Sequence, residues 1–528
     1  MKLHKLNIFS GTAAAALLLS LSACTGEFDK WNLDPSNATE AQRQVDNQAV
    51  GSPFSTMELG VMAVGNNRGG SFQICDILPG GQFGGYFANI KSSYGVGALH
   101  FSHYVLPDGW VNEPFVYAYT DVMQNWNTIK KESEKEGSDK NSFALATIVK
   151  VFGMSRLTDM YGPVPYTQFG TGATYVSYDS QETIYNSFFK ELDEAISVLV
   201  SYNESNRNAK LLADFDRVFG GDVARWLNFA NTLRLRLALR VAYANEGLAK
   251  QEAQKSIDLG RFMVQKEDAA IIKFTTGKNP FYEVTVDWGD LHESASIDSY
   301  MNGYNDPRIS KYFTPRDGGC FGVRLGLTNI NQTAYMNTTS PANVGEYDGV
   351  NWMTAAEGYF LRAEAKLRWD MGAESVQDLY EQGIRISFNE RGATGVEAYI
   401  ADDYSTPADF VDHSGKGDDA SALSNITIAW NEADNFETQL ERIITQKWIA
   451  IFPDGQEAWS EFRRTGYPKL FPTMNDNSGL NLKNLQIRRL RFPTSEYENN
   501  TANVNAAVSL LGGADNAKTQ LWWDKKKH

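Results

Sequence analysis

The stretch over residues 222–246 constrains the fold more than any other, because it is apolar on two sides of a helix. At about 100° per residue, one apolar stripe follows one face, and its members are Trp226, Phe229, Ala230, Leu233, Leu237, Val241 and Ala244. Leu235, Leu239 and Ala242 gather on the opposite face. A helix with two apolar faces must lie between neighbours, as helices do in stacked helical repeats. Arg240 falls within the first stripe, so we expect it to have a buried partner or to extend its charge to solvent.

Other segments with helical periodicity predict a mostly α protein. We expect further helices over 39–63, 115–135, 141–161, 181–202, 248–262, 354–370, 375–391, 434–452 and 455–464. The pair at 354–370 and 375–391 spans roughly the 34 residues of a tetratricopeptide unit, although the full repeat consensus is absent. The pattern predicts a scaffold of helix pairs, with short strands only at 271–274 and 322–325.

Three segments interrupt the helical pattern, at about 65–114, 275–350 and 398–425. The first two are rich in glycine and proline, with aromatic residues interleaved. Loops this long are usually functional or disordered, and the density of aromatic residues argues against disorder. The third segment is polar and acidic, and we expect it to be an exposed insertion.

The N-terminus has the pattern of an export signal. Lys2 and Lys5 precede an apolar run that is too short to span a bilayer and ends in Leu21-Ser22-Ala23-Cys24. These four residues resemble a bacterial lipobox, which implies cleavage before Cys24 and acylation of that residue. An ordinary signal cleaved nearby is the alternative. We therefore expect a signal peptide over 1–23, a lipidated tether over 24–38 and a single domain over 39–528.

Charge and cysteine content narrow the possible partners. The formal net charge of −15 disfavours binding to nucleic acid or to anionic lipid surfaces. Beyond residue 21 no apolar run approaches the roughly 20 residues of a membrane helix.

Besides Cys24, the chain contains only Cys75 and Cys320. A single disulfide and two buried thiols are both open possibilities.

Several short motifs occur in order behind the lipobox. They are Asp-Pro-Ser-Asn-Ala-Thr at 34–39, Thr-Asp-Met-Tyr-Gly-Pro-Val-Pro-Tyr at 158–166, Arg-Trp-Leu-Asn-Phe-Ala-Asn-Thr-Leu-Arg-Leu-Arg at 225–236, Gln-Lys-Trp-Ile-Ala at 446–450, Glu-Ala-Trp-Ser-Glu-Phe-Arg-Arg-Thr-Gly-Tyr-Pro at 457–468, Arg-Arg-Leu-Arg-Phe-Pro-Thr-Ser-Glu-Tyr at 488–497 and Leu-Trp-Trp-Asp at 521–524. Together they resemble the SusD/RagB family, specifically its SusD-like branch, over essentially the whole mature chain. We expect most motif residues to be structural, with Arg463 and Arg464 pairing with acidic neighbours.

The resemblance implies a fold and a role. Family members carry four tetratricopeptide-like helix pairs with an irregular region packed beside them. They are lipid-anchored proteins on the outer-membrane surface of Bacteroidota and sit on a SusC-like TonB-dependent transporter. They bind a nutrient, usually an oligosaccharide and sometimes a peptide, and deliver it to the pore. Glu27 and Asp29 resemble the acidic signal that directs such lipoproteins to the surface.

Catalytic signatures are missing from the sequence. His100 and His103 lack the companions of a zinc site, and neither a Gly-x-Ser-x-Gly elbow nor a phosphate loop occurs. The pairs Asp402-Asp403 and Asp418-Asp419 lie in the polar insertion, whereas a catalytic acid needs burial to raise its pKa. We expect no cofactor and no metal, although calcium at the insertion stays open. The sequence predicts a binding protein and not an enzyme.

The two aromatic-rich irregular segments carry the candidate ligand-binding residues. Rings that could form a platform are Trp110, Tyr86, Trp288 and Tyr304, and polar side chains that could bind hydroxyls are Asn89, Asn302 and Arg308. The alternative is that each ring packs its own loop and that Asp306-Pro307-Arg308 only shapes a turn. A nutrient-binding lid, a glycan-degrading lipoprotein and a purely structural protein are the hypotheses that the sequence leaves.

Overall fold

The structure is a computed structural model that describes residues 47–65, 67–91, 101–274, 277–328, 330–415 and 418–526. The predicted signal peptide and tether, with Cys24, lie outside these ranges, as does His100. Within the described ranges, none of the helices has the length and apolar character that crossing a membrane would require.

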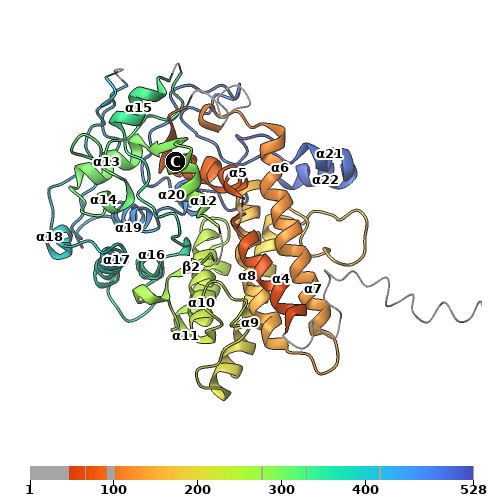
Figure 1. Ribbon diagram of the computed structural model, residues 1–528. Helices are drawn as coiled ribbons and strands as arrows, with labels where there is room; N and C mark the ends of the chain where they lie inside the picture. The colour runs from red at the N-terminus through yellow and green to blue at the C-terminus, as the bar shows by residue number, and fades with distance from the viewer. Residues whose placement is uncertain are drawn as a thin grey trace, which may run out of the picture.

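Paired helices form the scaffold. α8 (Lys140–Tyr161) packs on α9 (Gln181–Ser205), α10 (Val223–Arg240) on α11 (Glu246–Leu259), and α16 (Ala355–Trp369) on α17 (Val376–Arg391). α19 (Phe436–Ala450) leads through a short turn into α20 (Gly455–Thr465), while α4 (Gln48–Gly60) and α7 (Gln124–Ser133) pack together beside α8. Figure 1 shows these helices sweeping from α7 on the right, through α10, to α17 on the left. The predicted tetratricopeptide-like scaffold is confirmed.

Local sequence determines where the scaffold helices begin and end. Asp139, Ser180, Asp222 and Ser375 each precede a helix and accept a hydrogen bond from a backbone N–H of its first turn. Gly392 follows α17 with a φ of 60°, in the left-handed region that ends many helices. The predicted bounds of 141–161 and 375–391 consequently lie within one residue of those observed.

The two-faced helix is sandwiched as predicted. α10 contacts α9 on one side and α16 on another, and Trp226, Leu233 and Leu235 are completely buried. The buried guanidinium of Arg240 donates to Glu457 and Glu461, with both distances 2.5 Å, and lies 3.3 Å from Asp159. The expectation of a buried partner for Arg240 is therefore correct.

Arg240 belongs to a larger buried charge network between α10, α16, α19 and α20. We define this network by Arg236, Arg240, Lys447, Arg464, Glu357, Glu364, Glu457 and Glu461, all of them buried. Lys447 Nζ lies 3.1 Å from Glu457 and 3.2 Å from Glu461. Burial alone would raise the pKa of Glu457, but Arg240, Arg236 and Lys447 together lower it to about 2. Arg464, Lys447 and Arg240 likewise hold the pKa of Glu461 well below its ordinary value, so Glu457 and Glu461 stay ionised well below neutral pH.

Part of the first segment expected to be a loop is helical. α5 (Gly69–Phe72) continues directly into the π-helix η1 (Gln73–Gly81), and α6 (Asp108–Tyr117) continues through η3 (Ala118–Met123) into α7. A Cβ atom added to Gly80 would lie 2.5 Å from the backbone nitrogen of Gln456, and one on Gly455 would lie 2.4 Å from that of Gly81. These glycines let η1 and the start of α20 pack backbone against backbone. They mark a close contact and not a flexible loop.

The two irregular segments converge beside the scaffold, as expected. β1 (Phe87–Asn89) pairs antiparallel with β3 (Leu291–Glu293), and β2 (Ala270–Ile272) pairs with β4 (Val350–Met353). The expected strand at 271–274 corresponds to β2, whereas the one at 322–325 is only an isolated bridge between Ser294 and Val323. Short helices fill the region: η2 (Phe101–His103), α12 (Pro280–Tyr282), η5 (Glu283–Asp287), α13 (Ala295–Gly303), α14 (Ile309–Tyr312) and α15 (Gln332–Thr338). η4 (Lys266–Asp268) packs instead on α10, α16 and α17 of the scaffold. We call the part built from the first two irregular segments the loop region; its helices α5, α12, α13 and α15 lie in the upper half of Figure 1, whereas β2 lies lower, beside α10.

The remaining segments cover the edges of the molecule. α18 (Val396–Ile400) opens the polar insertion, which is largely exposed but is held by Phe410, 1% exposed, and by a hydrogen bond from Ala408 N to Ser299 O of 2.8 Å. α21 (Thr494–Asn499) and α22 (Thr501–Leu510) lie near the C-terminus.

Cys75 and Cys320 are both free and buried, so the disulfide alternative is ruled out.

Candidate functional site

Two of the four candidate rings are buried in the loop region. Tyr86 is 0% exposed and Tyr304 is 2% exposed. The Tyr86 hydroxyl donates to the carbonyl of Trp448 at 2.5 Å, and its ring stacks on the Trp448 indole. The Tyr304 hydroxyl donates to the carbonyl of Ile426 at 2.9 Å. Both rings fasten the loop region to its surroundings, and neither presents a face to solvent.

The polar candidates are also engaged in internal contacts. Arg308 is completely buried and donates to Asp306 at 2.6 Å and to Ser387 at 2.8 Å. Asn302 donates to Asp298 at 3.0 Å and to the carbonyl of Cys320 at 2.8 Å, and Asn89 is completely buried in β1. These contacts order the loop region itself, and a role of these side chains in hydroxyl binding stays a prediction. For Arg308, the turn-forming alternative fits the structure.

A conservative change at Tyr304 tests whether its side chain stabilises the loop region or contacts a ligand. Tyr304→Phe leaves a buried carbonyl at Ile426 without its partner, so we expect a loss of about 1–3 kcal/mol in the free energy of unfolding. Affinity for any ligand of the protein should stay unchanged. Urea unfolding and binding calorimetry on the same preparation measure the two quantities. Unchanged stability together with weakened binding would indicate that Tyr304 contacts the ligand.

Trp110 is a partly buried ring at the outer end of an aromatic stack. It lies nearly parallel to Phe101, with ring centroids 5.9 Å apart and an interplanar angle of 14°. Phe101 packs on Phe83, and Phe83 packs on Trp459 of α20 at 5.3 Å. The stack thus runs from the scaffold to the surface, and it holds the Trp110 ring in a fixed orientation.

Trp288 is partly buried at the end of η5, and its backbone is fixed by charged neighbours. Its carbonyl accepts a hydrogen bond from Lys91 Nζ at 2.6 Å, and Lys91 also pairs with Asp290. Gln73 of η1 donates to Asp290 at 2.6 Å. The indole lies against Gly69, where an added Cβ atom would be 3.0 Å from the ring.

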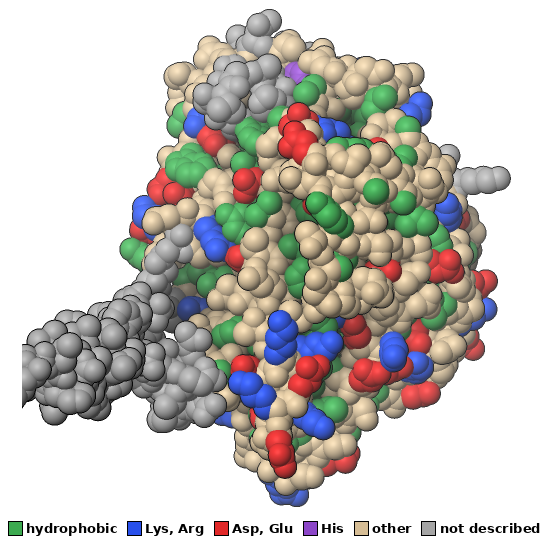
Figure 2. Space-filling view, turned by 90° about the vertical axis from the view of Figure 1, so that its right-hand side faces the viewer, with side chains coloured by type: hydrophobic (Ala, Val, Ile, Leu, Met, Phe, Trp, Pro, Cys, Tyr) green, Lys and Arg blue, Asp and Glu red, His purple; other side chains and the backbone are tan. Residues whose placement is uncertain are grey.

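α5 connects the segment that carries Trp288 to the helix that carries Trp110. α5 contacts α12 and η5, and it reaches α6 through a 2.8 Å hydrogen bond between the hydroxyls of Ser71 and Tyr117. We define the aromatic surface by its partly buried rings, which are Trp110, Tyr117, Tyr282 and Trp288. On the face seen in Figure 2, hydrophobic side chains gather mainly in the upper half and charged side chains in the lower half.

Sequence reasoning missed Tyr117 and Tyr282 as members of this surface. Tyr117 falls in a segment with helical periodicity, and Tyr282 stands next to Phe281, which is buried. The guanidinium of Arg68 lies 4.9 Å from the Tyr117 ring centroid, and Lys278 Nζ lies 5.8 Å from that of Tyr282. Neighbouring aromatic and basic residues were the only signal available, and it is a weak one.

A separate cleft lies where the scaffold meets the loop region. We call it the junction cleft; its volume is about 350 Å³. Its walls include Phe87, Phe281 and Phe452, which are buried, while Lys311 and Asn343 stand exposed among its lining residues. Its size reaches the lower range of small-molecule sites.

Glu390 brings a titratable group to the junction cleft. Burial, only partly offset by Arg391, raises the pKa of Glu390 from its ordinary 4.5 to about 7. The folded state therefore holds a proton that the unfolded chain releases between these values, so stability falls as pH rises from about 4.5 to 7. Glu390→Gln should remove roughly 3 kcal/mol of this decline. Urea unfolding of both proteins at a series of pH values measures the fall in the free energy of unfolding. An equal fall in the wild-type protein and in Glu390→Gln would contradict the prediction.

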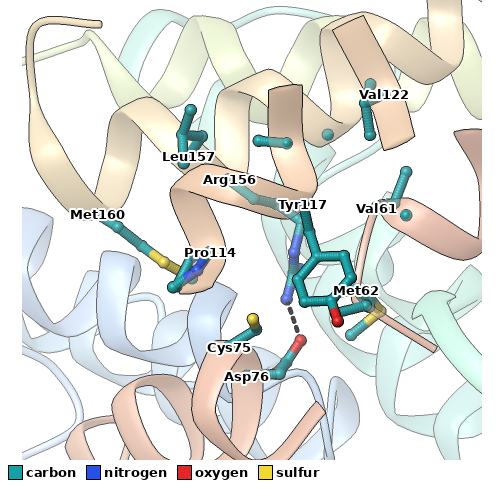
Figure 3. A pocket seen from close by; sticks show the side chains of 14 residues that line it. Val61, Met62, Cys75, Asp76, Pro114, Tyr117, Val122, Arg156, Leu157 and Met160 are labelled. Carbon is teal, nitrogen blue, oxygen red and sulfur yellow. Dashed lines mark hydrogen bonds and ion pairs between the residues drawn. The ribbon is translucent and has the colours of Figure 1, made fainter. Parts of the chain in front are cut away.

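Two other cavities are weaker candidates for a ligand site. The one in Figure 3 has a volume of about 30 Å³, room for about one water molecule, beside the buried pair of Arg156 and Asp76 at 2.7 Å. A groove of about 750 Å³ lies between α7, α8 and α9. At its edge Lys150 lies 3.8 Å from the Trp126 ring centroid and 2.7 Å from Glu191, so the protein supplies its own cation to that ring.

The groups considered for catalysis do not assemble. Asp402 accepts hydrogen bonds from the backbone N–H groups of Tyr404 and Ser405, which lower its pKa against the effect of burial. Asp418 has its pKa raised by burial and by Asp412, on the exposed insertion. Among the described residues, no cluster of His, Cys, Asp and Glu has the arrangement of a metal site. None of the four aspartates of these two pairs lines the junction cleft.

Comparison with protein-family models gave a match over most of the chain. A family model described as "SusD-like: Susd and RagB outer membrane lipoprotein" matches residues 30–524. Comparison with curated proteins gave no match.

Three solved structures illustrate the likeness. A chitin-binding SusD homolog from Flavobacterium johnsoniae is 37% identical, with a TM-score of 0.85 and coverage of 90% of this chain and 98% of that chain. A SusD homolog from Bacteroides uniformis is 39% identical, with a TM-score of 0.84 and coverage of 90% and 99%. A SusD-like protein from Bacteroides thetaiotaomicron is 35% identical, with a TM-score of 0.84 and coverage of 90% and 99%.

Proposed function

Because this chain belongs to the SusD-like/RagB family of outer-membrane lipoproteins, we propose that it binds an oligosaccharide at the cell surface and passes it to a SusC-like TonB-dependent transporter. In this proposal residues 1–23 are the signal peptide, 24–38 form the lipidated tether, and 39–528 form one binding domain.

The observation that carries the proposal is the aromatic surface. Trp110 and Trp288 come from two different irregular segments, and both residues are partly buried. The Trp110 ring stacks on Phe101, and the backbone carbonyl of Trp288 is held by Lys91. Rings fixed in advance lose little conformational entropy when a ligand binds. The apolar faces of sugar rings stack on such platforms, while their hydroxyls can bond to polar neighbours. The chitin-binding relative from Flavobacterium johnsoniae adds support for a carbohydrate ligand.

A peptide is the alternative ligand, since peptide side chains also pack on aromatic surfaces. A glycan-degrading activity is less well supported, because the acidic pairs Asp402-Asp403 and Asp418-Asp419 lie on the insertion and do not line the junction cleft.

Binding calorimetry with chito-oligosaccharides, other oligosaccharides and mixed peptides tests the proposal. We expect binding of at least one oligosaccharide with no release of product, and co-purification with a SusC-like transporter. Binding of peptides alone would select the alternative. Product release from a polysaccharide would overturn the assignment as a binding protein, and transporter association without any ligand would point to a structural role.

The lipid anchor gives a separate prediction. Cys24→Ala removes the thiol and the amino-terminal cysteine that acylation requires, so the protein should lose its retention at the outer membrane. Ligand binding by the purified variant should be unchanged. Fractionation of cells that lack the transporter measures retention, with Ser22→Ala as a matched control near the cleavage site. A Cys24→Ala protein that still fractionates with the outer membrane would contradict the anchor.

A further inference from the structure

The groove between α7, α8 and α9 contains apolar side chains that the scaffold leaves partly uncovered. Its volume is about 750 Å³, and we call it the helix groove. Phe143 of α8 and Ala195 and Val198 of α9 line it, and Val198 is 37% exposed. Trp126 of α7 is fixed at its side, because the indole N–H donates to Thr147 at 3.2 Å. The helix groove is therefore a preformed apolar surface on an otherwise charged part of the scaffold.

The described chain begins beside the helix groove. A second cavity, of about 330 Å³, adjoins the groove at the loop between α7 and α8, and Ser133, Lys135 and Ser138 line both. Asn47 and Val50, at the start of α4, line the second cavity as well. α4 packs along α7 (Figure 1). The residues that precede Asn47 consequently enter the domain next to the groove.

The chain upstream of Asn47 includes a group of large apolar residues. Phe28, Trp31 and Leu33 all lie in the tether predicted over 24–38. Flexible linkers are rich in glycine, serine and other polar residues, whereas clusters of large apolar residues on a surface mark contact sites. A linker that only connects a lipid to a domain has no need of this group, so we looked for a surface that it could cover.

The length of the chain allows the apolar group to reach the helix groove. Trp31 precedes Asn47 by 16 residues, and a chain of this length spans at most roughly 50 Å. The groove follows α9 from Glu191 to Val198, which is about 10 Å of helix. Every part of the groove therefore lies within reach of Trp31.

Charges at the rim of the groove complement those of the same segment. Lys140, the first residue of α8, and Glu136, in the loop before it, both line the groove and are exposed. Neither makes an ion pair with another described residue. Asp29, Lys30 and Asp34 bring charges of both signs, so each rim residue can meet an opposite charge. Exposed pairs of this kind favour one orientation more than they add affinity.

We propose that residues 28–33 of this chain dock in the helix groove, with Trp31 packed against Phe143 and Val198. The chain from Cys24 to Glu27 then spans no more than about 14 Å. The end of the scaffold that carries the groove is thereby held close to the lipid. This orientation rests on the proposed lipid anchor, whereas the docking itself does not.

Hydrogen exchange on the mature protein with Cys24→Ala tests the docking without lipid or transporter. We expect the backbone amides of residues 28–33 to exchange at least about tenfold more slowly than those of a free chain. Val198→Asp puts a charge into the apolar surface of the groove, so these amides should then exchange as a free chain does. Val286→Asp is the matched control, because Val286 is also 37% exposed but belongs to η5 of the loop region. It should leave the protection of residues 28–33 unchanged.

A second variant keeps the proposal falsifiable if Val198→Asp disturbs α9. Trp31→Ala changes no described residue and should also release residues 28–33 to free exchange. Free exchange of these residues in the Cys24→Ala protein would overturn the proposal, and so would protection that survives both Val198→Asp and Trp31→Ala. Loss of protection in Val286→Asp would likewise overturn it.

Other occupants of the groove give different results. An oligosaccharide that slows exchange along α8 and α9, while residues 28–33 exchange freely, would assign the helix groove to the nutrient and overturn the docking. A protein that binds no oligosaccharide would contradict the proposed function. That result would leave the protection of residues 28–33 unaffected, so the two failures are distinguishable.

Discussion

Arg464→Met should lower the free energy of unfolding by about 3–5 kcal/mol, because it removes one cation from the buried charge network. Arg464 donates to Glu364 at 2.6 and 2.7 Å, and to Glu461 at 2.8 and 2.6 Å, with all three side chains buried. Methionine approximates the length of the arginine stem, so the loss of packing is small. The two carboxylates would keep their other cations but would lose a bidentate partner each.

An exposed ion pair provides the matched control for Arg464. Arg385 pairs with Glu397 at 2.8 Å, and the Glu397 side chain is 69% exposed. Arg385→Met should therefore cost no more than about 1 kcal/mol. The midpoint and slope of urea unfolding give both values under identical conditions. Similar losses for the two variants would show that the buried network contributes no more than a surface pair.

Trp110→Ala should weaken ligand binding by about 1–3 kcal/mol while leaving the fold intact. The ring is partly exposed and stacks on Phe101, so its removal takes away the outer end of the stack and leaves Phe101, Phe83 and Trp459 in place. Calorimetry with whichever oligosaccharide binds the wild-type protein measures the loss. Trp288→Ala should weaken binding in the same range, because its ring belongs to the same surface.

A tryptophan in the scaffold controls for nonspecific effects of these substitutions. Trp369 is also partly buried, ends α16 and donates to Glu246 at 3.2 Å. Trp369→Ala should leave ligand affinity unchanged. If affinity is also unchanged in Trp110→Ala, Trp110 does not contact the ligand, and the platform must lie elsewhere in the loop region.

The scaffold was predictable because its signals are local. The periodicity of 222–246 predicted that α10 is buried on both sides, and capping residues such as Asp139 and Ser375 lie next to the helix starts they determine. The η1 segment was missed for the opposite reason. Its glycines are explained by a contact with Gly455 and Gln456, which lie far along the chain. A glycine needed for close packing looks the same in a sequence as one needed for a turn.

The candidate site was less predictable, because burial depends on tertiary neighbours. Tyr86 and Trp288 both stand in glycine-rich, aromatic-rich segments, yet Tyr86 is stacked against Trp448 of α19 and Trp288 reaches the surface. Nothing near Tyr86 in the sequence indicates that Trp448 will cover it. The same holds for Arg308, whose partner Ser387 belongs to α17. Residue type pointed to these segments, and the three-dimensional structure shows which of their aromatic residues are buried and which reach the surface.

The glycine contact between η1 and α20 has a consequence for engineering specificity. Because Gly80, Gly81 and Gly455 join the two parts backbone to backbone, the joint does not depend on the side chains that face a ligand. Segments 101–117 and 278–291 can then be replaced by the corresponding segments of a relative without changing the contact between η1 and α20. Such a chimera should fold like the parent and take the donor's ligand preference.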